Sequence, residues 1–142
     1  MNDTPHPNQL KQAIGEFEVD MQPLEGYAVG IEGITLSRMS IDKRFIGDLA
    51  ATSQGEMLSA LTGTSGSAGY VAIEQVDGTL HGRRGTFVLQ HFGLMTRGSS
   101  LLLLKVVPDS GTGELANLTG TMLIKIEEGV HRYEFDYAFD GG

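Results

Sequence analysis

The chain has 142 residues, of which 40% are hydrophobic, and it contains no cysteine. This length and composition predict one soluble globular domain with a substantial core, and the lack of cysteine excludes disulfides, a thiol nucleophile, iron–sulfur clusters and cysteine-ligated zinc. The formal net charge of −8 opposes phosphate-rich partners, so no nucleic-acid partner is expected.

The first twelve residues have prolines at positions 5 and 7 and no apolar stretch. We expect residues 1–12 to form a flexible tail before a single domain at 13–142, and not a signal peptide. The longest apolar run, Leu101–Leu104, is far shorter than the roughly 20 residues that span a bilayer. The expected location is therefore the cytoplasm, with no membrane partner.

Most of the chain consists of short apolar or alternating segments that Gly, Asp, Ser or Pro residues separate. Rich in β-branched and aromatic residues, these segments predict strands at 13–20, 34–41, 48–61, 69–76, 86–91, 99–107, 121–127 and 131–139. No stretch sustains a helical period over three turns. Eight strands with short connections predict an all-β sandwich or barrel.

A glycine pattern repeats along the chain. Gly78-Thr-Leu leads to Gly85, and Gly113-Glu-Leu leads to Gly120 at the same spacing. We interpret this echo as a repeated hairpin connection, with glycines where the strands turn a corner. Repetition of one corner around the sheet favours a closed barrel.

The segment Leu101–Val107 is apolar on both faces of its predicted strand. One face of an antiparallel sheet normally meets water, so the second face needs a cover. Either another part of this chain or a second subunit can provide it. We favour a homo-oligomer formed through the Leu101–Val107 strand face, because few residues remain for a covering helix.

Three patterns that resemble chemical motifs have simpler explanations. Gly111–Ala116 matches a dinucleotide fingerprint, but a strand follows it where the cofactor needs a helix. The small-residue loop Thr62–Gly69 lacks the serine spacing of a nucleophile elbow and the lysine of a P-loop. The four histidines form no metal-binding pair. No cofactor and no metal site are expected.

Glu74 is the most suggestive carboxylate. In the strand 69–76, either Glu74 or Gln75 must point inward if one face packs on the core. An inward Glu74 with a raised pKa is a weak candidate for a general base. It is equally consistent with an outward charge, or with an inward carboxylate paired with Arg83, Arg84 or a tyrosine hydroxyl.

Alternation also assigns an interior face to the last strand, where His131, Tyr133, Phe135, Tyr137 and Phe139 share one side. We predict an apolar interior wall with a few polar contacts. The wall residues are Tyr70, Phe87, Tyr133, Phe135 and Tyr137, and the polar candidates are Glu74, Gln90, His91 and His131.

The segments Tyr70–Glu74, Gly78–His91 and Ser110–Leu115, with the closing pattern His131-x-Tyr-x-x-x-Tyr137, resemble an uncharacterised bacterial family of the allene oxide cyclase-like barrel group. The resemblance covers about residues 13–139 and implies a calycin-like, eight-stranded antiparallel β-barrel. It implies no function, and it carries over no catalytic residue.

Three functions follow as hypotheses. The first is a barrel that binds a small hydrophobic molecule. The second is a filled barrel that acts as an oligomeric structural or interaction protein. The third is a cyclase or isomerase in which Glu74 or His91 moves a proton.

Overall fold

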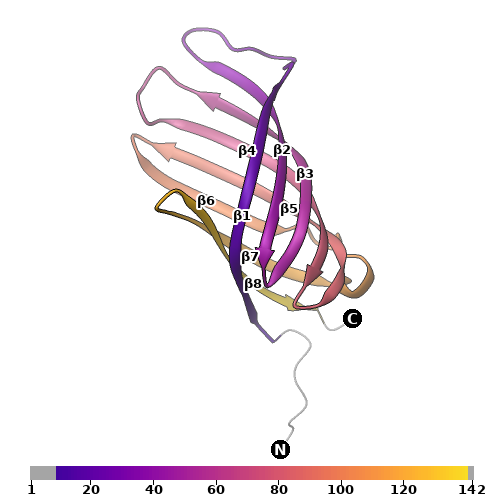
Figure 1. Ribbon diagram of the computed structural model, residues 1–142. Helices are drawn as coiled ribbons and strands as arrows, with labels where there is room; N and C mark the ends of the chain where they lie inside the picture. Colours follow the sequence, from indigo (N-terminus) through magenta and orange to yellow (C-terminus); the bar gives the residue numbers. More distant parts are fainter. Residues whose placement is uncertain (1–8, 141–142) are drawn as a thin grey trace, which may run out of the picture.

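The computed structural model describes residues 9–140 and shows eight antiparallel strands that close into one barrel (Figure 1). The strands are β1 Lys11–Leu24, β2 Thr35–Gly47, β3 Leu49–Leu61, β4 Ala68–Leu80, β5 Arg83–Thr96, β6 Ser99–Val106, β7 Leu118–Glu127 and β8 Val130–Phe139. A 3₁₀ turn, η1 (Gly113–Leu115), lies between β6 and β7. Among residues 9–140, no helix has the length and apolar character needed to cross a membrane.

The strands follow one another around the barrel in chain order, and β8 closes it by pairing with β1. The predicted eight strands and the all-β, antiparallel barrel are confirmed. β1 already begins at Lys11, inside the predicted tail, whereas residues 1–8 of that tail lie outside the described part of the chain.

Each strand buries the side chains of one parity. On β2, for example, Ile41, Lys43 and Phe45 are buried, whereas Asp42 and Arg44 between them are exposed. Successive side chains of a strand point to opposite faces, so the same alternation around the sheet produces one interior. The core therefore lies inside the barrel.

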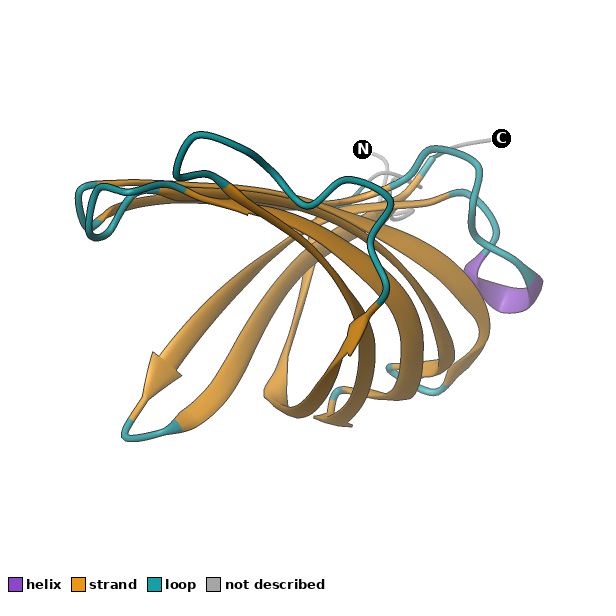
Figure 2. Ribbon diagram, turned by 90° about the horizontal axis from the view of Figure 1, so that it is seen from above, coloured by secondary structure: helices purple, strands orange, loops and turns teal. Residues whose placement is uncertain are grey.

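One end of the barrel is densely packed, and we call it the closed end. It carries the β2–β3, β4–β5 and β6–β7 connections, and its inward residues Leu49, Leu80, Leu115 and Leu118 are at most 1% exposed. Figure 2 shows the strongly curved strands and the position of η1 at the rim. The glycine echo is a hairpin in only one of its two copies. The predicted hairpin between β4 and β5 is present, but it turns at His81–Gly82, and Gly78 pairs with Gly85 inside the strands. Gly113 begins η1 in the eleven-residue connection between β6 and β7.

The other end, which we call the open end, carries the β1–β2, β3–β4, β5–β6 and β7–β8 connections (upper left in Figure 1). At this end, several residues whose side chains face the interior remain exposed, such as Leu61, Met95 and Ser100. The interior is therefore accessible from this end.

The barrel wall has a weak seam between β6 and β7. These strands share only two registered pairs, Leu104 with Met122 and Lys105 with Thr121. On the other side of β6, eight positions from Leu89 to Thr96 pair with it. The sheet is therefore interrupted toward the open end, where the two strands no longer pair.

Candidate functional site

Four strands bring a polar cluster into the apolar interior of the barrel. Glu74 on β4 is fully buried, and its Oε2 accepts a hydrogen bond from Lys43 Nζ on β2 at 2.8 Å. Ser53 on β3 donates to the other oxygen, Oε1, at 2.6 Å. His91 Nε2 on β5 also bonds Glu74 Oε2. The register therefore selects Glu74, and not the exposed Gln75, as the inward residue.

Lys43 is almost fully buried as well, with 7% of its surface exposed. Its ammonium lies 4.9 Å from the centre of the Phe17 ring and 5.7 Å from that of Phe45. A buried ammonium requires a counter-charge, which Glu74 provides, and the two rings add a favourable cation–π contact. The ion pair is thus shielded from solvent by apolar side chains.

Burial by itself raises the pKa of Glu74, but the hydrogen bond from His91 and the positive charge of Lys43 outweigh this effect and lower the pKa to about 2. The sequence prediction of a raised pKa was wrong, because the hydrogen bond from His91 and the charge of Lys43 stabilise the ionised form of Glu74. The sequence analysis also considered Arg83, Arg84 or a tyrosine hydroxyl as the partner of Glu74. The side chains that bond Glu74 are instead those of Lys43, Ser53 and His91. Glu74 is an ionised carboxylate at neutral pH.

Tyr70 connects the buried cluster to the open end. Its hydroxyl lies 3.2 Å from His91 Nδ1, and the two rings are 6.0 Å apart. The Tyr70 ring packs over Gly93, which is its direct partner on β5 and leaves the space that a side chain there would fill. Burial and the negative charge of Glu74 raise the pKa of Tyr70, so its hydroxyl stays protonated at neutral pH.

A cavity of about 280 Å³ lies at the open end, next to Tyr70. Most of its side chains are apolar, and two serine hydroxyls contribute polar groups; its inward-facing lining includes Met57, Ser59, Leu61, Met95, Ser100 and Leu102. This volume lies at the lower limit of small-molecule pockets, roughly 300 Å³. Methionine side chains are flexible and adapt to differently shaped apolar partners.

The predicted aromatic wall fills the barrel and does not surround an open cavity. Phe87 stacks on Phe135 at 5.8 Å, and Phe135 stacks on Tyr137 at 5.4 Å, all of them at most 2% exposed. The Tyr133 hydroxyl accepts a hydrogen bond from the backbone of Leu49 at 2.9 Å. These residues form the packed floor beneath the polar cluster.

Of the predicted site residues, Tyr70, Glu74 and His91 come together, whereas Phe87, Tyr133 and Tyr137 belong to the floor. Gln90 points outward from β5 and is exposed, so the structure does not bring it to this site. His131 lies against the Phe17 ring at 5.0 Å and has no hydrogen bond to the cluster among the described residues.

Sequence reasoning missed Lys43 and Ser53. The sequence does contain a signal for Lys43, because Lys43 alternates with Ile41 and Phe45 and so lies on the apolar face of β2. A lysine at such a position is either a misread strand or a buried cation with a partner. The described residues contain no group of His, Asp and Glu side chains arranged to hold a metal ion.

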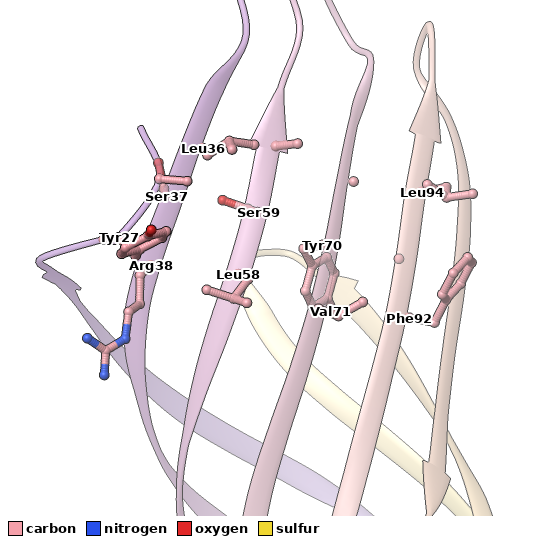
Figure 3. Close-up of a pocket in the computed structure, with 15 residues that line it drawn as sticks. Tyr27, Leu36, Ser37, Arg38, Leu58, Ser59, Tyr70, Val71, Phe92 and Leu94 are labelled. Carbon is pink, nitrogen blue, oxygen red and sulfur yellow. The ribbon is translucent and has the colours of Figure 1, made fainter. Parts of the chain in front are cut away.

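A second cavity, of about 690 Å³, lies on the outer face of the sheet (Figure 3). The β1–β2 connection, including the fully exposed Tyr27, borders it on one side. Leu58, Val71 and Phe92, on neighbouring strands β3, β4 and β5, form its floor. This cavity is a groove lined by exposed apolar side chains.

Comparisons with known proteins place the chain among proteins without a described function. Residues 13–137 match the family described as "Protein of unknown function (DUF3224)". A crystal structure of a protein of unknown function from the DUF3224 family of Shewanella oneidensis MR-1 is 56% identical to this chain; it covers 94% of this chain and 100% of its own length, with a TM-score of 0.92. No curated protein matches the chain.

Proposed function

The chain belongs to the DUF3224 family, and we propose that its barrel binds a small, largely apolar molecule at the open end. The observation that carries this proposal is the chain of contacts from Lys43 through Glu74 and His91 to Tyr70, which lines the open-end cavity. Ligand pockets are typically apolar with a few fixed polar groups, and this cavity has that composition. Membership of the allene oxide cyclase-like group is part of the same proposal, supported by the eight-stranded closed barrel.

The polar cluster favours binding over a structural role. A buried ion pair is rarely better for stability than apolar side chains of the same volume. A barrel that only had to be filled could hold apolar side chains there without loss of stability. A cluster that instead orients one hydroxyl beside a cavity explains why charged groups occur there.

The same cluster argues against acid–base chemistry. A general base works best with a pKa near the working pH, whereas the pKa of Glu74 is about 2. Both oxygens of Glu74 are already hydrogen-bonded, and its side chain is fully buried. The pKa of Tyr70 is raised, which disfavours a reactive phenolate. Binding without turnover is therefore the better-supported function.

The binding proposal is tested with the uncharged fluorescent probe N-phenyl-1-naphthylamine. We expect saturable binding that Leu102→Trp abolishes, because a bulky ring at this interior position fills the cavity. Leu123→Trp, on the exposed outer face of β7 and away from both cavities, is the matched control. Equal binding by the two variants, or no saturable binding by the native protein, would contradict the proposal. Native mass spectrometry of freshly purified protein identifies any ligand that co-purifies.

The apolar outer face supports a second role, the self-association of two chains. Register places Leu58, Val71, Phe92 and Leu103 side by side across β3 to β6, and they are between 44% and 57% exposed. Leu101 also faces outward on β6, at 58% exposed. Only this half of the predicted Leu101–Val107 face points outward, because Leu104 and Val106 are buried inside.

Charge complementarity makes a second copy the preferred occupant of this face. Glu56 on β3 and Lys105 on β6 occupy opposite ends of one row of registered neighbours. Glu56 also pairs with Arg38 of its own chain at 2.7 Å and has a second oxygen for a further partner. A two-fold axis that runs parallel to the strands between β4 and β5 therefore sets Glu56 against Lys105 of a second copy, twice. The same axis sets Leu58 against Leu103.

Light scattering measures this association directly. We expect about twice the 15.2 kDa mass of one chain at micromolar concentration. Phe92→Glu is expected to give monomers, and Leu123→Glu, at a similarly exposed position on β7 outside this face, is its control. Lys105→Glu is expected to weaken the dimer, because it sets two carboxylates against each other, whereas Lys105→Arg, which keeps the positive charge, is expected to retain it. A monomeric native protein would contradict the proposed dimer without affecting the binding proposal.

A further inference from the structure

The hydrogen bonds of the polar cluster have directions that the chemistry fixes. Glu74 is ionised and carries only acceptors, so each partner must donate to it. His91 Nε2, which bonds Glu74 Oε2, therefore carries a hydrogen. The tautomer of His91 follows from the charge of its neighbour.

The other imidazole nitrogen of His91 is consequently an acceptor. Lys43 already balances the charge of Glu74, and a protonated His91 would add an uncompensated charge to a cluster that is 7% exposed at most. A neutral imidazole with a hydrogen on Nε2 leaves Nδ1 bare. The Tyr70 hydroxyl, 3.2 Å away, therefore donates its hydrogen to His91 Nδ1.

This direction decides what Tyr70 offers to a ligand. A phenol has one hydrogen to donate, and here that hydrogen points toward His91. Tyr70 lines the open-end cavity, and its oxygen has only lone pairs left to offer a ligand there. The remaining polar side chains of the cavity are Ser59 and Ser100, whose hydroxyls can donate or accept and therefore favour neither kind of ligand. No lysine, arginine or histidine lines the cavity.

We infer that the open-end cavity selects apolar molecules whose polar end is a hydrogen-bond donor, such as an alcohol or a phenol, over carboxylates and ethers of the same size. This inference rests on the proposed binding function and specifies its ligand class. An alcohol donates to the Tyr70 oxygen. At the Tyr70 oxygen, an ether places an acceptor against an acceptor. A carboxylate adds a negative charge that no cationic side chain of the cavity balances.

Three ligands of similar length separate these possibilities: 1-octanol, octyl methyl ether and octanoate, each titrated against the bound probe N-phenyl-1-naphthylamine at pH 7.5. We expect 1-octanol to displace the probe about ten-fold more effectively than the other two, which corresponds to the net value of one hydrogen bond. In Tyr70→Phe, the ratio of 1-octanol to ether displacement, each measured against the probe bound to the same variant, is expected to fall to about one. Tyr70 is only partly buried and Phe retains its ring, so this variant keeps the fold.

Failure of the proposed ligand class and failure of the proposed binding function give different results in this experiment. Equal or stronger displacement by the ether or octanoate, with the probe still bound, would overturn the ligand class and leave the binding function intact. A preference for 1-octanol that survives Tyr70→Phe would show that another group provides the acceptor and would also overturn the inference. Absence of probe binding would remove the binding function itself.

Discussion

At the scale of single residues, three donors from three different strands hold the carboxylate of Glu74. Lys43 provides a charged donor, Ser53 a hydroxyl and His91 a ring nitrogen. No buried side-chain polar atom among the described residues is left without a partner. A network in which every polar group is satisfied defines one arrangement of its members, because any change leaves a buried group unpaired.

Removal of one member of the Lys43–Glu74 ion pair should therefore lower the free energy of unfolding far more than removal of both members. We expect Lys43→Met to lower the free energy of unfolding by about 3 to 5 kcal/mol, because it leaves the Glu74 carboxylate buried without a counter-charge. Lys43→Met/Glu74→Leu should recover most of that loss. Urea denaturation at pH 7 measures both. Equal stability of Lys43→Met and the native protein would show that Glu74 does not depend on the ion pair.

The lowered pKa of Glu74 also makes stability depend on pH. The pKa rises from about 2 in the folded protein to about 4.5 on unfolding, so the unfolded state takes up a proton first as the solution is acidified. The stabilisation is complete above pH 4.5 and disappears as pH falls toward 2, with a total of about 3 kcal/mol. Urea denaturation between pH 6 and pH 2 should show this loss, and Glu74→Gln should flatten the curve in that range. A parallel slope in the variant would assign the acid sensitivity to other carboxylates.

At the scale of strands and turns, three hairpins use the same two-residue connection. His81–Gly82, Arg97–Gly98 and Glu128–Gly129 each have two successive residues with positive φ, between 46° and 90°. Two such residues form the type I′ turn, whose twist matches that of the strands it joins. The second position favours glycine because it has no Cβ to strain this backbone.

Glycine has two roles in this barrel. The first is to adopt a positive φ in turns, and the second is to leave space where neighbouring strands approach closely; two alanine substitutions distinguish them. At Gly98 a Cβ meets nothing within 4 Å, so Gly98→Ala should cost only the strain of a positive φ, about 1 to 2 kcal/mol. At Gly78, inside β4, a Cβ would lie 2.5 Å from Ala51 Cα, so Gly78→Ala should cost more. Gly98→Asn should be milder than Gly98→Ala, since asparagine tolerates this conformation. A cost at Gly98 equal to that at Gly78 would contradict the distinction.

This second role of glycine explains why the strands could be predicted from the sequence but not their ends. β4 was expected to stop at Val76, because Gly78 resembles a turn residue, yet the strand continues to Leu80. There the glycine provides space between neighbouring strands and does not end the strand. Local patterns cannot separate the two roles, because the neighbour that needs the space comes from another part of the chain.

At the scale of the whole molecule, the same limit applies to the candidate site. The predicted binding wall included Tyr70 and His91, although alternation left the register of the strand 69–76 open, and the structure places both residues inside the barrel. The alternation of side chains could not show that Lys43 contacts Glu74, because β3 lies between their strands and the contact depends on the curvature of the closed barrel. The predicted pKa of Glu74 had the wrong direction for that reason. Contacts across the interior are therefore the part of the site that the sequence does not determine locally.

The interior is enclosed by a wall that is not equally strong around its circumference. β3 and β4 pair along thirteen positions, from Leu49–Leu80 to Leu61–Ala68, whereas β6 and β7 share two. Backbone groups of β6 and β7 that face the seam toward the open end lack a partner strand, and such groups exchange with water more easily. The seam should therefore be the least protected part of the barrel.

Hydrogen exchange measured residue by residue tests this expectation. Alternate amides of Leu101–Leu103 and Leu123–Ile126, those that point toward the seam, should exchange faster than amides at the centres of β3 and β4. The amides of β6 that bond to β5 provide an internal control on the same strand. If the open-end cavity binds 1-octanol, saturation should slow exchange at Leu102, which lines the cavity, more than at Leu123 on the outer face. Uniform protection of β3, β4, β6 and β7 would show that the seam is closed in solution, and access to the interior would then depend on the open end alone.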